Sequence, residues 1–187
     1  MKPSLLLHSC CAPCSTTALR RLAADFDITI YFYNPNLDSA LEHERRRAEL
    51  TKLKQLKIPF KTVSEPYSPK DYDAAVQGLE HLGEGSRRCY ACYSLRLEKT
   101  ALYAAAHHFT AFTTTLSVSP YKNLAWLHEI GEKLAQKYQI SYLSIDLKTQ
   151  NGYAESIATS KQLNLYRQTY CGCRYSKSEA ENRKVVK

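Results

Sequence analysis

The arrangement of the cysteines constrains this chain more than any other sequence feature. Seven of the 187 residues are cysteines. They fall in three tight groups, which are Cys10, Cys11 and Cys14; Cys89 and Cys92; and Cys171 and Cys173. Cysteines that only fill a core would be scattered, so the grouping indicates one shared site. Disulfides fit poorly with an odd count, and Met1 leads directly into a short strand rather than a signal peptide, so we expect the reducing cytoplasm.

The first cysteine group lies where a strand is expected to meet a helix. The apolar run 5–7 is typical of a buried strand, and Ser15 is expected to cap a helix that continues to Leu22. In an α/β sheet, such a turn lies at the carboxyl end of a strand, where ligands bind. The free N–H groups of the helix favour negative charge there, which suits thiolates.

Strand-like and helical segments alternate along most of the chain. Strands are expected at 5–7, 28–33, 60–63, 109–116 and 141–146, and helices at 15–22, 39–56, 71–79, 89–107 and 124–138. This alternation predicts a single α/β domain over 1–187, with a Rossmann-like parallel sheet of about five strands and helices on both faces. A C-terminal helix and loop from 151 to 173 and a flexible basic tail complete the prediction.

The expected helix 39–56 has one apolar side and one basic side. Leu41, Ala48, Leu53 and Leu56 recur at helical spacing, which indicates the side that faces the core. The run 45–47 consists of three arginines, which more often form a solvated face than a binding patch.

Thiolates are soft ligands that select zinc, copper(I) or iron–sulfur clusters. Seven sulfurs exceed the four of a structural zinc site, whereas four suffice for a [4Fe–4S] cluster and three remain for a second metal ion, for which we expect iron. Cys89 and Cys92 share a helix face and can serve one centre, while each other group can split between two. We predict Cys11, Cys89, Cys92 and Cys171 as cluster ligands, and Cys10, Cys14 and Cys173 at the second metal. Two zinc ions sharing seven thiolates are the competing interpretation.

Charge points towards a polyanionic partner. The chain has 26 Lys and Arg against 18 Asp and Glu, a formal net charge of +8, and its 14 tyrosines offer rings that can stack on unpaired bases. Backbone contacts are expected from Arg45, Arg46, Arg87, Arg88 and Lys122 around the site mouth. Further substrate-binding candidates are Tyr33, Asn34, Tyr121, Asn123 and Arg167. Asp146 is a candidate proton donor, with a turn cap as its alternative role, and His8 is expected to pack rather than to bind metal.

Five motifs together resemble the QueH-type epoxyqueuosine reductases. In chain order, they are HSCCAPC at 8–14, YNPN at 33–36, RCYACY at 88–93, TTLSVSPYKN at 114–123 and LYRQTYCGC at 165–173. The resemblance implies a fold like that of nucleotide α-hydrolases. It also implies reduction of the epoxide of epoxyqueuosine, at the wobble position of tRNA with a GUN anticodon, to the cyclopentene of queuosine. An external electron donor is then required, and no membrane is involved.

The expected mechanism follows from this reaction. Electrons pass through the cluster, while a metal held by Cys10 and Cys14 with an open position acts as a Lewis acid on the epoxide oxygen. Water or Asp146 then protonates the departing oxygen. The chain departs from some family members in having Cys14 where they have aspartate. Two alternatives stay open: a zinc-bearing tRNA-binding protein without redox activity, and an ATP-using tRNA thiolase, although the first turn lacks a glycine-rich phosphate loop.

Overall fold

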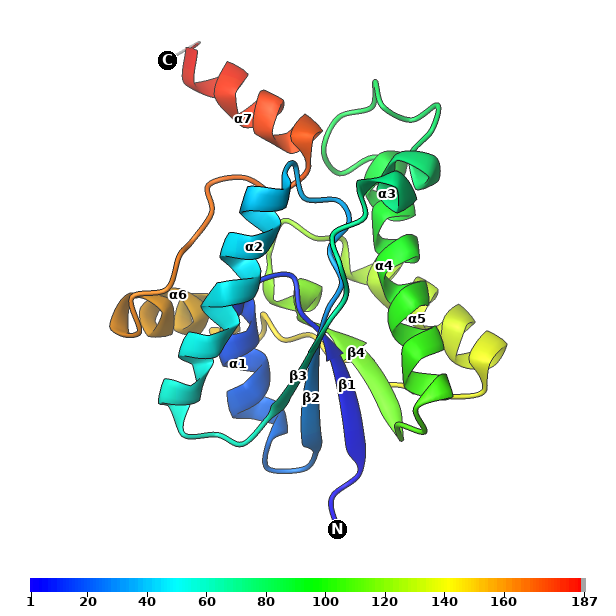
Figure 1. Cartoon of the computed structure of the whole chain (residues 1–187), viewed down its shortest axis with the longest axis vertical. Coiled ribbons are helices and arrows are strands. Elements are labelled where there is room, and N and C mark those ends of the chain that lie inside the picture. Colours follow the sequence, from blue (N-terminus) through cyan, green and yellow to red (C-terminus); the bar gives the residue numbers. More distant parts are fainter. Residues whose placement is uncertain (186–187) are drawn as a thin grey trace.

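The computed structural model describes residues 1–185 and contains a five-stranded, entirely parallel sheet (Figure 1). Its strand order is β3-β2-β1-β4-β5, so β1 lies at the centre and receives neighbours on both sides. The strands are β1 (Ser4–His8), β2 (Asp27–Phe32), β3 (Lys61–Ser64), β4 (Ala111–Thr114) and β5 (Ser141–Tyr142). The predicted Rossmann-like α/β fold is therefore confirmed.

Helices cover both faces of the sheet, as Figure 1 shows for α1 and α2 on one side and α4 and α5 on the other. The α-helices are α1 (Ala12–Leu22), α2 (Ala40–Glu49), α3 (Pro69–Ala75), α4 (Arg87–Ala106), α5 (Leu124–Tyr138), α6 (Gly152–Gln162) and α7 (Arg174–Val185). Successive side chains of a strand point to opposite faces. Accordingly, Leu5 and Leu7 pack in the core beneath α1, whereas Leu6 packs in the core beneath α4 and α5. None of the helices formed by the described residues is long and apolar enough to cross a membrane.

Helix α1 begins earlier than predicted. Cys11 occupies the N-cap position and Pro13 lies in the first turn, where proline is favoured because its missing N–H would be unpaired anyway. Ser15 is not the cap. It lies inside the helix, and its hydroxyl donates to the Cys11 carbonyl at 3.0 Å. The consequence is that Cys14 belongs to the first turn of α1, on the same helix end as Cys11.

The segment 39–56 departs from its expected amphipathic pattern. Ser39 caps α2, which ends at Glu49 and continues as a 3-10 helix, Leu50–Leu56. Leu41 is 80 % exposed, contrary to the prediction, because the buried side of α2 carries the ion pair of Glu42 and Arg46 instead. Arg46 was expected on the solvated face and is only 2 % exposed.

Three other predicted segments differ in extent. β4 ends at Thr114, where a 3-10 turn, Thr115–Val118, takes over, and β5 is only two residues long. The tail that was expected to be flexible forms α7 as far as Val185, and residues 186–187 lie outside the described part of the chain. Glu179 of α7 pairs with Arg88 at 2.9 Å, and Lys177 pairs with Asp38 at 2.6 Å.

Candidate metal centre and substrate cavity

The turn after β1 gathers three thiols. The sulfur atoms of Cys10, Cys11 and Cys14 all lie within 4.8 Å of one another, and those of Cys10 and Cys11 are 3.6 Å apart. The thiols of Cys10 and Cys14 hydrogen-bond to Cys11 and, with the charge of Arg46, hold the pKa of Cys11 well below its usual range. Cys10, Cys11 and Cys14 therefore form a compact set of soft ligands, and the lowered pKa of Cys11 favours the thiolate that binds metal.

Polar contacts fix this turn in place. The Asn34 side chain donates to the Ser9 carbonyl at 2.9 Å, and the Cys10 backbone N–H donates to the Thr115 hydroxyl at 3.2 Å. His8 is completely buried just before the turn, with Nδ1 2.8 Å from the Thr114 hydroxyl. Burial lowers the pKa of His8 to about 3, so the imidazole is neutral at pH 7. His8 thus packs with its polar atoms satisfied, as predicted.

The other four cysteines form a second group. Cys89 and Cys92 lie on the first turns of α4, and Cys171 and Cys173 precede α7. Burial raises the pKa of Cys89 and raises that of Cys92 to about 12, and the nearby thiols of Cys171 and Cys173 add to both effects. Cys92 and Cys173 belong to one cluster of buried side chains, so the two chain segments meet there.

This grouping differs from the predicted division of ligands. Cys11 lies with Cys10 and Cys14 rather than with the cysteines of α4, and Cys173 lies near Cys92. The reason is local: the helix begins at Ala12, so Cys11 at the N-cap and Cys14 in the first turn stay close to Cys10. These three sulfurs are close enough to share one metal ion, and the division of ligands between two centres stays a prediction.

Buried positive charges surround both groups. Lys122 donates to the Cys171 sulfur at 3.1 Å, and the Arg46 guanidinium donates to the Cys171 carbonyl at 3.3 Å. Although burial works against its charge, the thiol of Cys171 raises the pKa of Lys122 above its usual range. Arg96, one helical turn after Cys92, is 3 % exposed and has no carboxylate within ion-pair distance among the described residues. A buried cation of this kind calls for a nearby anion, which metal-bound thiolates would supply. The donor set and its surroundings fit a bound metal group.

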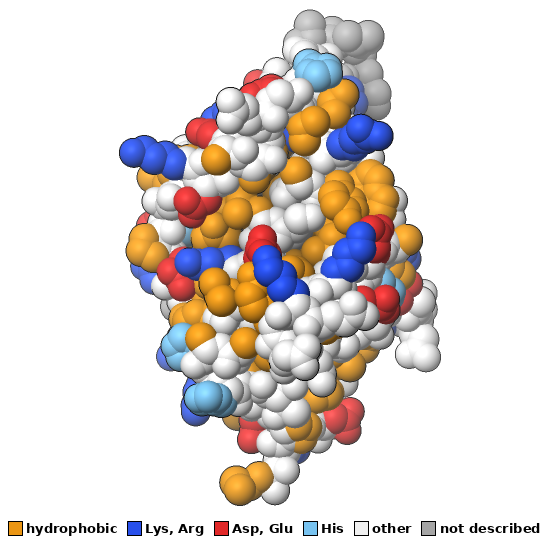
Figure 2. Space-filling model, turned by 90° about the vertical axis from the view of Figure 1, so that its right-hand side faces the viewer, with side chains coloured by type: hydrophobic (Ala, Val, Ile, Leu, Met, Phe, Trp, Pro, Cys, Tyr) orange, Lys and Arg blue, Asp and Glu red, His pale blue; other side chains and the backbone are white. Residues whose placement is uncertain are grey.

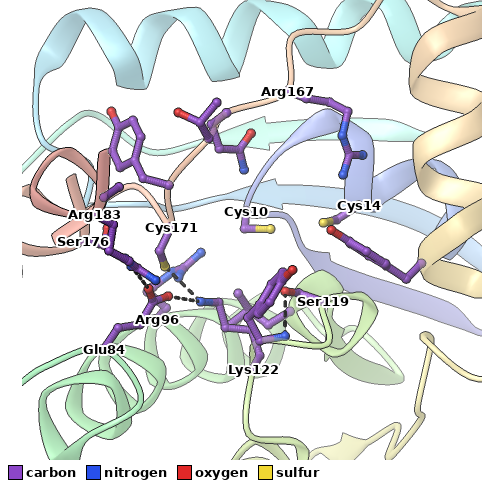
Figure 3. Close-up of a pocket in the computed structure, with 17 residues that line it drawn as sticks. Cys10, Cys14, Glu84, Arg96, Ser119, Lys122, Arg167, Cys171, Ser176 and Arg183 are labelled. Carbon is purple, nitrogen blue, oxygen red and sulfur yellow. Dashed lines mark hydrogen bonds and ion pairs between the residues drawn. The ribbon is translucent and has the colours of Figure 1, made fainter. Parts of the chain in front are cut away.

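Two thiols of the first group and one of the second, Cys171, line one cavity of about 450 Å³ (Figure 3). In the view of Figure 3, Cys10 lies between Cys14 and Cys171, and all three line the cavity. The volume is in the range of small-molecule sites. Lining residues of other types include Glu84, Arg96, Tyr121, Lys122, Tyr153, Arg167 and Arg183.

Three of the predicted substrate-binding residues lie at this cavity. Tyr121 is 73 % exposed at its edge, in edge-to-face contact with Tyr153, and Lys122 lies deeper beside Cys171. Arg167 donates to the Ser160 hydroxyl at 3.3 Å, and its guanidinium is 6.0 Å from the Tyr153 ring centroid. These side chains combine aromatic rings and positive charge around a thiol-lined interior.

Besides Cys11, Cys89, Cys92 and Cys173, four other predicted site residues do not line the cavity. Tyr33 is buried and donates its hydroxyl to Asp71 at 3.0 Å, and Asn34 is buried between Ser9 and Arg96. Asn123 caps α5 by accepting from the Trp126 N–H at 3.1 Å. Asp146 accepts from the Lys148 N–H at 3.0 Å, which is the turn-capping role.

Some cavity residues were missed at the sequence level. Arg96 follows Cys92 by four positions on a helix, so it had to share the face of the cysteine pair. Tyr153 follows the glycine that begins α6, but nothing local places it against Tyr121. Glu84 lies in a glycine-containing loop. Its carboxylate pairs with the Lys122 amine at 3.2 Å, a contact between distant residues that the sequence does not reveal.

Comparison with known proteins agrees with this architecture. The family model described as "Epoxyqueuosine reductase QueH" matches residues 5–179. Similar curated proteins carry the same name. The Streptococcus pyogenes protein is 38 % identical over 182 residues, covering 94 % of this chain and 71 % of its own length. The Thermotoga maritima protein is 36 % identical over 176 residues, covering 92 % and 90 %. The Dehalococcoides mccartyi protein is 35 % identical over 185 residues, covering 96 % and 95 %. Because the family model covers most of its residues and these relatives are 35–38 % identical, this chain belongs to the QueH family of epoxyqueuosine reductases.

Proposed function

We propose that this protein reduces the epoxide of epoxyqueuosine in tRNA to the alkene of queuosine. The reaction consumes two electrons and two protons, breaks both C–O bonds of the epoxide and releases the oxygen as water. The observation that carries the proposal is the cavity itself, because thiols of both cysteine groups and four positive side chains face one space large enough for a small-molecule group.

We assign the cysteines to two centres. Cys89, Cys92, Cys171 and Cys173 would hold a [4Fe–4S] cluster, and Cys10, Cys11 and Cys14 a second metal ion, for which we propose iron. This assignment replaces the division predicted from the sequence and is supported by the two spatial groups. When bound, the cluster supplies electrons one at a time and the three-ligand metal supplies a Lewis acid with an open position.

The residues of the chain bind and orient the substrate around these centres. Lys122, held between Cys171 and Glu84, places a positive charge where the oxygen leaves, and positive charge stabilises the negative charge that develops there. Tyr121 and Tyr153 offer rings against which an unstacked base can lie. We assign no proton-donor role to Asp146, because its carboxylate accepts from the Lys148 N–H and does not line the cavity. Water would deliver both protons that the reaction consumes.

The tRNA backbone would be bound by exposed basic residues around the cavity. Arg45 and Arg87 are exposed and remain candidates, and Arg183 lines the cavity edge. Arg46 and Arg88, expected at the mouth, are each 2 % exposed and pair with Glu42 and Glu179, so they are removed from this role. Figure 2 shows acidic side chains interspersed with the basic ones on one face, so the net charge does not form one continuous patch there.

The proposed substrate is tRNA with a GUN anticodon, and the electrons come from an external donor. A tRNA substrate and seven unpaired thiols favour a reducing compartment such as the cytoplasm. The competing proposal, a zinc-bearing tRNA-binding protein without redox activity, uses the same thiols and basic residues and differs in metal content.

Anaerobic reconstitution with iron and sulfide, followed by nucleoside analysis of tRNA carrying the epoxide, tests this proposal. We expect a coloured iron protein that converts the epoxide when a one-electron reductant is supplied. Cys10→Ala should retain most cluster absorbance and lose turnover, whereas Cys89→Ala should lose both. Full conversion by metal-stripped protein with a dithiol alone would refute the mechanism, and a colourless zinc protein without product would favour the competing proposal.

A further inference from the structure

Arg96 occupies a special position between the two cysteine groups. Its Nη2 atom donates to the Asn34 amide oxygen at 2.6 Å, and its Nη1 atom lies 4.0 Å from the Cys92 sulfur. Its Nε atom is buried and has no hydrogen-bond partner among the described residues. The side chain also lines the cavity together with Cys10 and Cys171 (Figure 3). The guanidinium therefore faces thiols of both groups.

The other buried cations near the cysteines have carboxylate partners. Arg46 pairs with Glu42 at 2.6 Å, Arg88 with Glu179 at 2.9 Å, and Lys122 with Glu84 at 3.2 Å. Within residues 1–185, the hydrogen-bond partners of the Arg96 guanidinium are the neutral Asn34 amide and the Cys92 thiol. No carboxylate therefore neutralises the positive charge of Arg96, and this charge lies beside the cysteine sulfurs.

We propose that Arg96 sets the reduction potential of the iron–sulfur group held by the second cysteine group, as a positioning residue that does not itself react. This inference rests on the proposed function. Each electron accepted from the external donor adds one negative charge to that group, and Arg96 neither gains nor loses an electron or a proton. A fixed positive charge and N–H groups directed at sulfur favour the reduced, more negative form, which raises the potential.

The size of the effect follows from the short separation and the burial. A unit charge near a thiolate in a water-poor interior interacts far more strongly than an exposed charge does. Removing the charge should lower the equilibrium constant for one-electron reduction at least tenfold, which corresponds to about 59 mV.

The test measures the potential of the full-length protein after anaerobic reconstitution, by titration with dithionite monitored by electron paramagnetic resonance. Arg96→Gln removes the charge and retains a donor for Asn34. Arg96→Lys retains the charge. Lys99→Met is the matched control, since it removes one exposed charge from the same helix. Asn34→Asp leaves Arg96 in place and supplies the missing carboxylate.

We expect Arg96→Gln and Asn34→Asp to lower the potential by at least about 59 mV at unchanged iron content. Arg96→Lys and Lys99→Met should remain near the wild-type value. A loaded Arg96→Gln protein with the wild-type potential would overturn the inference. If Arg96→Gln does not assemble the cluster, Asn34→Asp decides alone by the same criterion. If Asn34→Asp also fails to assemble the cluster while Lys99→Met succeeds, the reduction potential of Arg96→Lys decides. A potential lower than that of the wild type by about 59 mV, despite the retained charge, would overturn the inference. Wild-type protein that binds no cluster would refute the proposed function itself.

Discussion

Replacing Arg46 by methionine should destabilise the protein far more than the same change at Arg47. Both arginines belong to α2 and both pair with a glutamate on that helix, at 2.6 Å for Arg46 and 2.7 Å for Arg47. The pairs differ in burial, because the Arg46 side chain is 1 % exposed and that of Arg47 is 46 % exposed. The two variants therefore compare a buried ion pair with an exposed one on the same helix.

The expected magnitudes follow from this difference. Breaking a buried pair leaves Glu42 with only the Tyr166 hydroxyl, at 3.2 Å, and costs about 3–5 kcal/mol. An exposed pair contributes about 0.2–1 kcal/mol. Arg46 also donates to the Cys171 carbonyl, so its loss frees the segment that carries Cys171 and Cys173. For a chain of this size, the Arg46→Met cost corresponds to a Tm lower by roughly 6–20 °C.

Urea unfolding followed by circular dichroism, on metal-free protein under anaerobic reducing conditions, measures this difference. Metal-free protein is used because metal binding adds its own stabilisation. The double variant Glu42→Leu, Arg46→Met should recover part of the loss, since no buried charge then remains unpaired. If Arg46→Met and Arg47→Met shift the unfolding midpoint equally, the reasoning from burial is wrong.

Three further outcomes are expected. Asp146→Asn should leave the turnover of the reconstituted protein within about twofold of wild type, because an amide oxygen can still accept from the Lys148 N–H; a loss of activity would restore Asp146 as the proton donor. Tyr121→Ala should raise KM for tRNA more than it lowers kcat, since the exposed ring lies at the cavity edge against Tyr153; steady-state kinetics separate the two. Gly131→Ala should lower the free energy of unfolding by about 1–3 kcal/mol in the same urea assay, because the new Cβ would lie 2.4 Å from the Tyr142 ring.

Local patterns were sufficient to predict the layers of the fold. The alternation of apolar strands with helices required a parallel sheet, and Leu5, Leu6 and Leu7 could all be buried because helices cover both faces. The clustering of cysteines likewise predicted one shared site. These features depend on neighbours in the sequence or on periodicity, which sequence alone contains.

The burial of charge could not be predicted in the same way. Arg46 lies in an arginine run that looks solvated, and its partners include the carbonyl of Cys171, far along the chain. The role of Asn34 likewise depends on Arg96. Asn123 is a different case, since an asparagine directly before a helix is a common cap and its position alone indicated that role.

The placement of the thiols has a consequence for the order of assembly. Cys10 comes early in the sequence and Cys171 comes late, yet both line one cavity. Two of the early sulfurs are 3.6 Å apart and are free to oxidise to each other until they bind a metal of their own. The proposed cluster site, in contrast, can be completed only after the late segment docks against α4. From then on, the free energy of metal binding would hold Cys89 and Cys92 together with Cys171 and Cys173.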